Sequence, residues 1–101
     1  MLEAALRMDP TQPIAHMNLG NLAFAAGDLA AAERAYAQAI ALDPDYAPAH
    51  RNLGRLYLAQ RRPDLAERAF RHALALEPDS EIARRGLESA LRMRAGNATD
   101  Q

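Results

Sequence analysis

The sequence predicts an all-α fold, a right-handed α-solenoid built from antiparallel helix hairpins. Three observations support this prediction. The chain repeats itself with a period of 34 residues, its apolar residues recur at helical spacing, and proline or glycine separates the periodic segments. Alanine dominates the apolar residues, and its high helix propensity favours close-packed helices over strands.

Residues 13–46 superimpose on residues 47–80 when the chain is shifted by 34 residues, and nearly half of the aligned pairs are identical. The identical pairs include Ala15/Ala49, His16/His50, Asn18/Asn52, Leu19/Leu53, Gly20/Gly54, Leu22/Leu56, Ala32/Ala66, Ala39/Ala73 and Pro44/Pro78. We therefore expect two full repeats, at 13–46 and 47–79.

Each repeat divides into two helices, because a turn signal falls near its middle and a proline near its end. The predicted helices are 13–26 and 29–42 in the first repeat, and 47–60 and 63–76 in the second. Gly27 and Asp28 form the first turn, where the second repeat has Arg61 and Arg62.

The repeated glycines, Gly20 and Gly54, sit within predicted helices, where glycine is costly. Close helix approach explains them, with Ala32 and Ala66 expected on the facing helices. The predicted core residues are Leu19, Leu22, Leu53, Leu56, Tyr36 and Phe70, the two aromatic rings filling the space between hairpins.

The two ends are incomplete repeats. Residues 1–10 align with the end of a second helix, and we expect that helix to expose an apolar face. At the other end, Ser80 is a candidate N-cap for a terminal capping helix at 80–95. Residues 96–101 are expected to be a disordered tail.

This pattern resembles the tetratricopeptide repeat, whose period is 34 residues. The matching positions are Asn18-Leu19-Gly20, Ala32, Tyr36, Ala39 and Pro44, then Asn52-Leu53-Gly54, Tyr57, Ala66, Phe70, Ala73 and Pro78. Two residues depart from the family pattern: Ala23 where a large residue is preferred, and Arg61 in place of the turn glycine. The resemblance implies that the first helix of each hairpin lines a concave groove that holds an extended peptide.

Composition argues against an enzyme and against any cofactor or metal site. The chain has no cysteine, three histidines and a net charge of −1, and it contains no phosphate-binding glycine loop or nucleophile motif. His16 and His50 are interpreted as helix-interface residues. We expect no nucleic acid partner and no membrane segment, and cytoplasmic localisation is the default.

The groove residues implied by the resemblance come from the first helices and the capping helix. They are Met17, Asn18, Asn21, Phe24, Arg51, Asn52, Arg55, Leu58, Ile82, Arg85, Ser89 and Arg92. Asn18 and Asn52 recur at one repeat's spacing and resemble the asparagine ladder of O-GlcNAc transferases, which Gly86 would interrupt. A solvated asparagine typical of the family is the alternative interpretation.

The arginines of this set, with only Glu88 nearby, suggest an acidic peptide or a free C-terminus as ligand. A solvated arginine face is the alternative. The carboxylate clamp of chaperone-binding relatives is rejected, because Met17, Ile82 and Gly86 stand where it requires basic residues.

The function predicted from the sequence is therefore a non-catalytic module that binds a protein or an extended peptide. One alternative is self-assembly into a homo-oligomer through residues 1–10. Another is a regulatory fragment of a larger enzyme, such as a glycosyltransferase.

Overall fold

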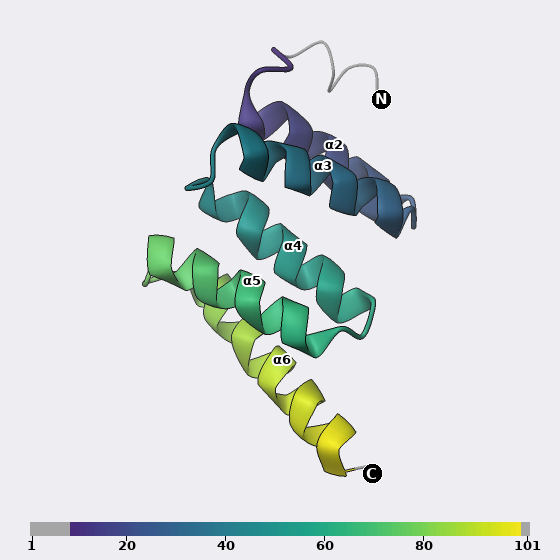
Figure 1. The fold of residues 1–101 in the computed structure, drawn as a ribbon, viewed down its shortest axis with the longest axis vertical. Helices are drawn as coiled ribbons and strands as arrows, with labels where there is room; N and C mark the ends of the chain where they lie inside the picture. The colour runs from purple at the N-terminus through teal and green to yellow at the C-terminus, as the bar shows by residue number, and fades with distance from the viewer. Residues whose placement is uncertain (1–8, 100–101) are drawn as a thin grey trace.

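A computed structural model describes residues 9–99, and of residues 97–99 it describes the backbone only. The described part folds into helices without strands (Figure 1). The helices are α2 (Pro13–Ala25), α3 (Leu29–Leu42), α4 (Ala47–Ala59), α5 (Pro63–Leu76) and α6 (Glu81–Thr99). The predicted all-α class is confirmed, and the helices of both full repeats end within a residue or so of their expected positions.

The helices stack along one direction, as in a solenoid. Helices α2 and α3 form one hairpin, α4 and α5 form the next, and α3 packs against α4 to join them (Figure 1). Helix α6 covers the far end by packing on α5 and, to a lesser extent, on α4. Each helix therefore contacts mainly its neighbours in sequence, which is the contact pattern of a repeat protein.

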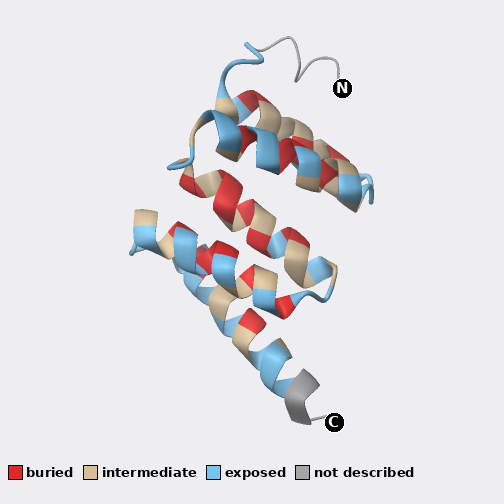
Figure 2. Ribbon diagram, viewed as in Figure 1, coloured by how far each residue is buried: buried red, intermediate tan, exposed pale blue. Residues whose placement is uncertain are grey.

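The core consists of alanines around a few large side chains, and the buried residues face neighbouring helices (Figure 2). Tyr36, Phe70 and Leu56 are the largest fully buried side chains. The repeated glycines permit close helix approach, as predicted, and Ala32 and Ala66 are buried on the facing helices α3 and α5. The nearest neighbours of the glycines, however, are aromatic rings on those helices. A Cβ added at Gly20 would lie 2.6 Å from the Tyr36 ring, and one at Gly54 would lie 2.8 Å from the Phe70 ring.

The start of α6 is as predicted, but its end is not. The Ser80 Oγ accepts a hydrogen bond from the Ala83 N–H at 3.2 Å, which confirms the expected N-cap. The helix then continues to Thr99 instead of ending at residue 95, so residues 96–99 are helical rather than disordered. Gly96 is a weak helix former but no proline follows it, so nothing stops the helix there. Of the predicted half-helix at residues 1–10, residues 1–8 lie outside the described residues.

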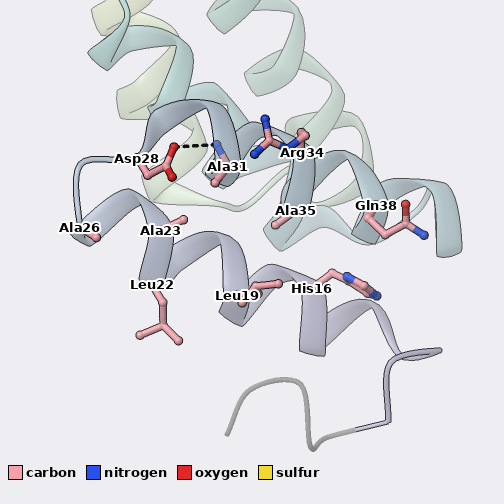
Figure 3. A pocket seen from close by; sticks show the side chains of 10 residues that line it. All are labelled: His16, Leu19, Leu22, Ala23, Ala26, Asp28, Ala31, Arg34, Ala35 and Gln38. Atoms are coloured by element: carbon pink, nitrogen blue, oxygen red, sulfur yellow. Dashed lines mark hydrogen bonds between the residues drawn. The ribbon is translucent and has the colours of Figure 1, made fainter. Parts of the chain in front are cut away.

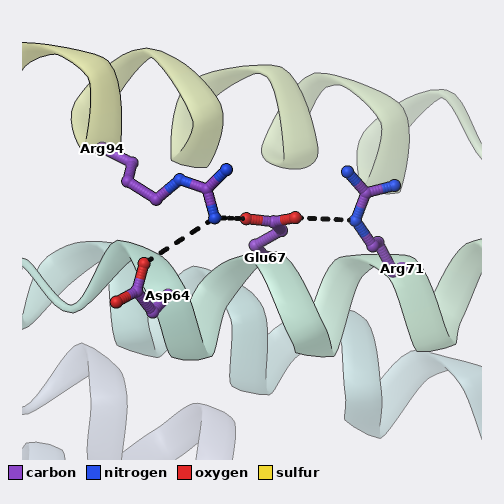
Figure 4. Close-up of polar contacts among 4 residues, drawn as sticks. All are labelled: Asp64, Glu67, Arg71 and Arg94. Atoms are coloured by element: carbon purple, nitrogen blue, oxygen red, sulfur yellow. Dashed lines mark hydrogen bonds and ion pairs between the residues drawn. The ribbon is translucent and has the colours of Figure 1, made fainter.

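A small group of charged side chains ties α6 to α5 (Figure 4). Arg94 donates to the Glu67 carboxylate at 2.5 Å and lies 3.9 Å from Asp64, while Arg71 Nε donates to Glu67 at 2.8 Å. The hydrogen bond from Arg71 and the charge of Arg94 hold the pKa of Glu67 below its usual range. These pairs are near the surface, so they orient α6 more than they stabilise it.

The two hairpin turns have the same geometry but different residues. Gly27 has φ +85°, and Arg61 occupies the equivalent left-handed position with φ +57°. In the second turn, the N–H groups of Arg61 and Arg62 donate to the carbonyls of Leu58 and Tyr57, at 3.0 and 2.8 Å. This is the Schellman arrangement that ends many helices. The side chain of Arg61 thus occupies a backbone conformation that glycine adopts without strain.

Replacing Arg61 with glycine is therefore expected to stabilise the protein. The left-handed conformation costs a non-glycine residue about 1–2 kcal/mol, and the added freedom of glycine in the unfolded chain offsets part of that gain. We expect Arg61→Gly to raise the unfolding free energy by about 0.5–1 kcal/mol in urea denaturation. The reciprocal change at the matched turn, Gly27→Ala, should lower it by a similar amount. If Arg61→Gly instead lowered the unfolding free energy, the Arg61 side chain would stabilise the fold by more than its left-handed backbone conformation costs.

Candidate functional site

A shallow pocket of about 250 Å³ lies between the first helices of the two hairpins, α2 and α4. It brings together three residues from the predicted groove that carry polar groups, Asn21, Asn52 and Arg55, with Phe24 as an apolar wall. Ala25 and the Tyr36 ring complete the lining. The pocket therefore combines hydrogen-bonding groups with one aromatic surface, as ligand sites commonly do.

Asn21 is the centre of the hydrogen bonds in this pocket. Its Oδ1 accepts from the Tyr36 hydroxyl at 2.6 Å and from Asn52 Nδ2 at 3.1 Å. Burial raises the pKa of Tyr36, so the phenol stays protonated and remains the donor. With its oxygen committed to the protein, Asn21 has its two amide N–H donors left for an external acceptor.

Arg55 supplies the positive charge at the pocket. Its side chain is exposed, and its guanidinium carbon lies 5.9 Å from the centroid of the Phe24 ring. Within residues 9–99, no carboxylate lies within ion-pair distance of Arg55. A planar cation of this kind beside an amide donor suits a carboxylate or a peptide carbonyl.

Two of the other predicted groove arginines are neutralised. Arg51 lies 3.7 Å from the Glu77 carboxylate, and Arg85 Nε lies 3.2 Å from that of Glu81. The expectation that only Glu88 accompanies the arginines is therefore wrong. Glu77 lies at the end of α5, so spacing along the first helices does not reveal its contact with Arg51. Glu81 stands four residues before Arg85 on α6, so the helical spacing could have revealed that pair.

The remaining predicted site residues lie outside this pocket. Met17 is half-buried and packs against the core cluster around Tyr36, and Asn18 is half-buried on α2. Ser89 and Arg92 are exposed on α6. Asn52, the counterpart of Asn18, is only 7% exposed and points its amide nitrogen at Asn21.

Sequence analysis assigned Tyr36 to the core and missed its role in the pocket. The signal lies in the comparison of the repeats, since the equivalent residue, Phe70, has no hydroxyl. A buried tyrosine usually finds a partner for its hydroxyl. The first repeat has both a tyrosine and an amide, Tyr36 and Asn21, where the second repeat has neither at the equivalent positions, Phe70 and Arg55. This joint difference could have indicated that Asn21 is the partner of the tyrosine hydroxyl.

The predicted helix-interface histidines close the turns between hairpins. The Nε2–H groups of His16 and His50 donate to the Pro10 and Pro44 carbonyls, both at 2.8 Å. The His50 ring also stacks on His72 with centroids 3.9 Å apart. Burial, with a further contribution from His72, lowers the pKa of His50.

Two further findings concern the described part of the chain. It contains no group of three or more His, Cys, Asp or Glu residues placed to hold a metal ion. None of its helices combines the length and apolar character needed to cross a bilayer.

A family model described as tetratricopeptide repeat matches residues 23–91. A comparison with curated protein sequences found no match. Among solved structures, the crystal structure of MamA protein is 28% identical with a TM-score of 0.84, over 93% of this chain and 51% of that one. The chain thus spans about half the length of the MamA chain.

Two further solved structures share the fold. The tetratricopeptide domain of Sgt2 from Aspergillus fumigatus is 25% identical with a TM-score of 0.85, over 99% of this chain and 67% of that one. The first such domain of Spaghetti (RPAP3), bound to the HSP90 peptide SRMEEVD, is 24% identical with a TM-score of 0.87, over 93% and 77%.

Proposed function

The chain belongs to the tetratricopeptide repeat family, and we propose on this premise that it binds an extended peptide segment through the pocket between α2 and α4. The family is generally a non-catalytic protein-interaction fold. The observation that carries the proposal is the group formed by Asn21, Asn52 and Arg55 beside Phe24.

The chemistry of these residues favours an acidic ligand. The Arg55 guanidinium can donate two parallel hydrogen bonds to one carboxylate, and the Asn21 amide can donate to a neighbouring backbone carbonyl. Asn52 keeps its Oδ1 as an acceptor for a peptide N–H. A short peptide that presents a carboxylate next to an apolar side chain would use both Arg55 and the Phe24 ring.

Arg55→Gln should therefore weaken binding of an acidic peptide without disturbing the fold. The probe is a fluorescein-labelled eight-residue peptide that alternates glutamate with valine and ends in a free carboxylate. Loss of one charge-assisted pair is worth about 1.5–3 kcal/mol, so the Kd should rise roughly tenfold or more. Fluorescence anisotropy titration at low salt gives the Kd directly.

The matched control is Arg68→Gln, since Arg68 is an exposed arginine on α5 that lines a different pocket. This variant should bind the peptide within about twofold of the unaltered protein, and both variants should keep the same helicity by circular dichroism. A peptide with an amidated C-terminus separates recognition of the terminal carboxylate from recognition of glutamate side chains. If both arginine variants lost peptide affinity equally, the peptide would be bound by non-specific charge attraction rather than by Arg55 in the pocket. No binding at millimolar peptide would contradict the acidic-ligand proposal.

A further inference from the structure

Two histidine rings lie face to face beside the joint between the two hairpins, where α3 packs against α4. The ring of His50 on α4 stacks on that of His72 on α5, with the ring centroids 3.9 Å apart and the planes inclined by 11°. His50 is only 7% exposed, whereas His72 is exposed to solvent. Stacked rings attract each other while at most one of them is charged. Two charged rings at this separation repel each other, and the burial of His50 limits the water that could screen them.

His50 also holds the turn that leads from α3 into α4. Its Nε2–H donates to the Pro44 carbonyl at 2.8 Å, within the turn that is closed by the bond from the Tyr46 N–H to the Asp43 carbonyl at 3.0 Å. Because Nε2 carries the hydrogen of this bond, Nδ1 is the atom at which the His50 ring takes up a second proton. A displaced His50 ring would therefore release the turn as well as its stacking partner.

The surroundings of His50 contain more groups that oppose its protonation than groups that favour it. The ring lines a hollow that α3 bounds with uncharged side chains, and none of the described residues of α2 or α6 lines that hollow. The titratable side chains around the ring come from the turn, from α4 and from α5, and they are Asp45, Tyr57, Arg68 and His72. Burial and the neighbouring His72 lower the pKa of His50, although the Pro44 carbonyl and Asp45 favour the charged ring. Arg68 adds a further positive charge to the hollow, and the Tyr57 hydroxyl is bonded to Glu33 of α3.

The first hairpin offers an internal comparison, because it has the same turn without the second ring. His16 donates to the Pro10 carbonyl at 2.8 Å, as His50 does to Pro44, but the residue equivalent to His72 is Gln38. Figure 3 shows the side chains of His16 and Gln38 at the same end of a pocket between α2 and α3. An amide takes up no proton near neutral pH, so this hairpin lacks a pair that can become doubly charged. The turn geometry therefore does not require a second histidine.

We propose that the stack of His50 on His72 is an acid-sensitive joint, which loosens the packing of α3 against α4 when both rings are protonated in mildly acidic solution. The first proton is tolerated, because one charged ring can stack on a neutral one. The second proton sets charge against charge, and the His50 ring leaves its place in the turn. Stability is expected to fall as the pH drops below the usual histidine pKa of 6.5, since the unfolded chain then binds a proton that the folded joint resists. This inference concerns the joint itself and does not depend on peptide binding.

The test compares urea denaturation at about pH 7.5 with that at about pH 5.5, a range in which histidine is the side chain that titrates. His72→Gln reproduces the arrangement of the first hairpin. His16→Gln is the matched control, because it also removes one histidine but leaves the stack intact. On acidification, the urea midpoints of the unaltered protein and of His16→Gln should fall by the same amount. The midpoint of His72→Gln should fall by no more than about half as much.

Two NMR measurements locate the effect. The pKa of the His50 ring should rise in His72→Gln, because one of the causes that lower it is removed. Protection of the Tyr46 N–H against hydrogen exchange should fall in acid in the unaltered protein and persist in His72→Gln. Equal shifts of the urea midpoint in these two proteins would overturn the proposal, because the exposed His72 ring would then simply turn away into solvent. An unchanged His50 pKa, or full protection of the Tyr46 N–H at the acidic pH, would overturn it as well.

Discussion

Replacing Phe70 with alanine is expected to remove most of the stability of the second repeat and the capping helix. The ring is fully buried, and it lies against the backbone of both Gly54 on α4 and Gly86 on α6. Truncation of a buried phenylalanine to alanine typically costs about 3–5 kcal/mol. Since a domain of this size has about 5–15 kcal/mol in total, Phe70→Ala should lower the urea midpoint severely.

The loss should be local as well as large. In a repeat protein, stability is approximately a sum over repeats and their interfaces, and Phe70 contributes to both the α4–α5 hairpin and its interface with α6. Native-state hydrogen exchange should therefore show loss of protection in α5 and α6 before α2 and α3. Ile82→Ala, which truncates a side chain on α6 that is 56% exposed, is the matched control and should cost less than about 0.5 kcal/mol. If Phe70→Ala cost no more than this control, the ring would not be what holds α6 in place.

The fold was predictable because the repeat carries nearly all of the information. The 34-residue identity between the two halves locates both hairpins, and the prolines mark their ends. The end of α6 was not predictable from Gly96, because a glycine marks a helix end only when it adopts the left-handed conformation, and the sequence does not report φ. Gly96 is within the helix, whereas Gly27 has φ +85°.

The candidate site was predictable in outline and not in detail. The resemblance to the tetratricopeptide repeat placed Asn21, Asn52 and Arg55 among the expected groove residues, and the structure brings these three into one pocket. Periodicity on one helix does not show what a neighbouring helix or turn contributes. It therefore missed the Tyr36 hydroxyl, which engages Asn21, and the Glu77 carboxylate, which neutralises Arg51.

The same limit applies to Gly86, which sequence comparison treated as a missing step in the asparagine ladder and as a missing basic residue of the carboxylate clamp, but not as a packing residue. A Cβ added there would lie 2.3 Å from two atoms of the Phe70 ring, closer than any real contact. The ring has little room to retreat, because Gly54 lies against it on α4, at 2.8 Å by the same measure. Glycine at position 86 is therefore required by the packing of Phe70, irrespective of any ligand.

Gly86→Ala should consequently destabilise the protein although alanine is the better helix former. Overpacking of a tight core costs about 1–3 kcal/mol, and at 2.3 Å we expect the cost to exceed the gain of up to about 1 kcal/mol in helix propensity. Gly96→Ala is the control within the same helix, since an added Cβ there meets nothing within 4 Å. It should leave the urea midpoint unchanged or raise it slightly.

A double substitution distinguishes a steric cause from any other. If the Phe70 ring is what rejects the methyl group, the smaller side chain in Phe70→Leu should recover part of the loss caused by Gly86→Ala, so the two changes should not be additive. Additive losses would mean that Gly86 acts elsewhere, for instance through the backbone of α6. A higher midpoint for Gly86→Ala alone would show that α6 can shift outward at little cost, and α6 would then be a loosely held cap rather than part of the core.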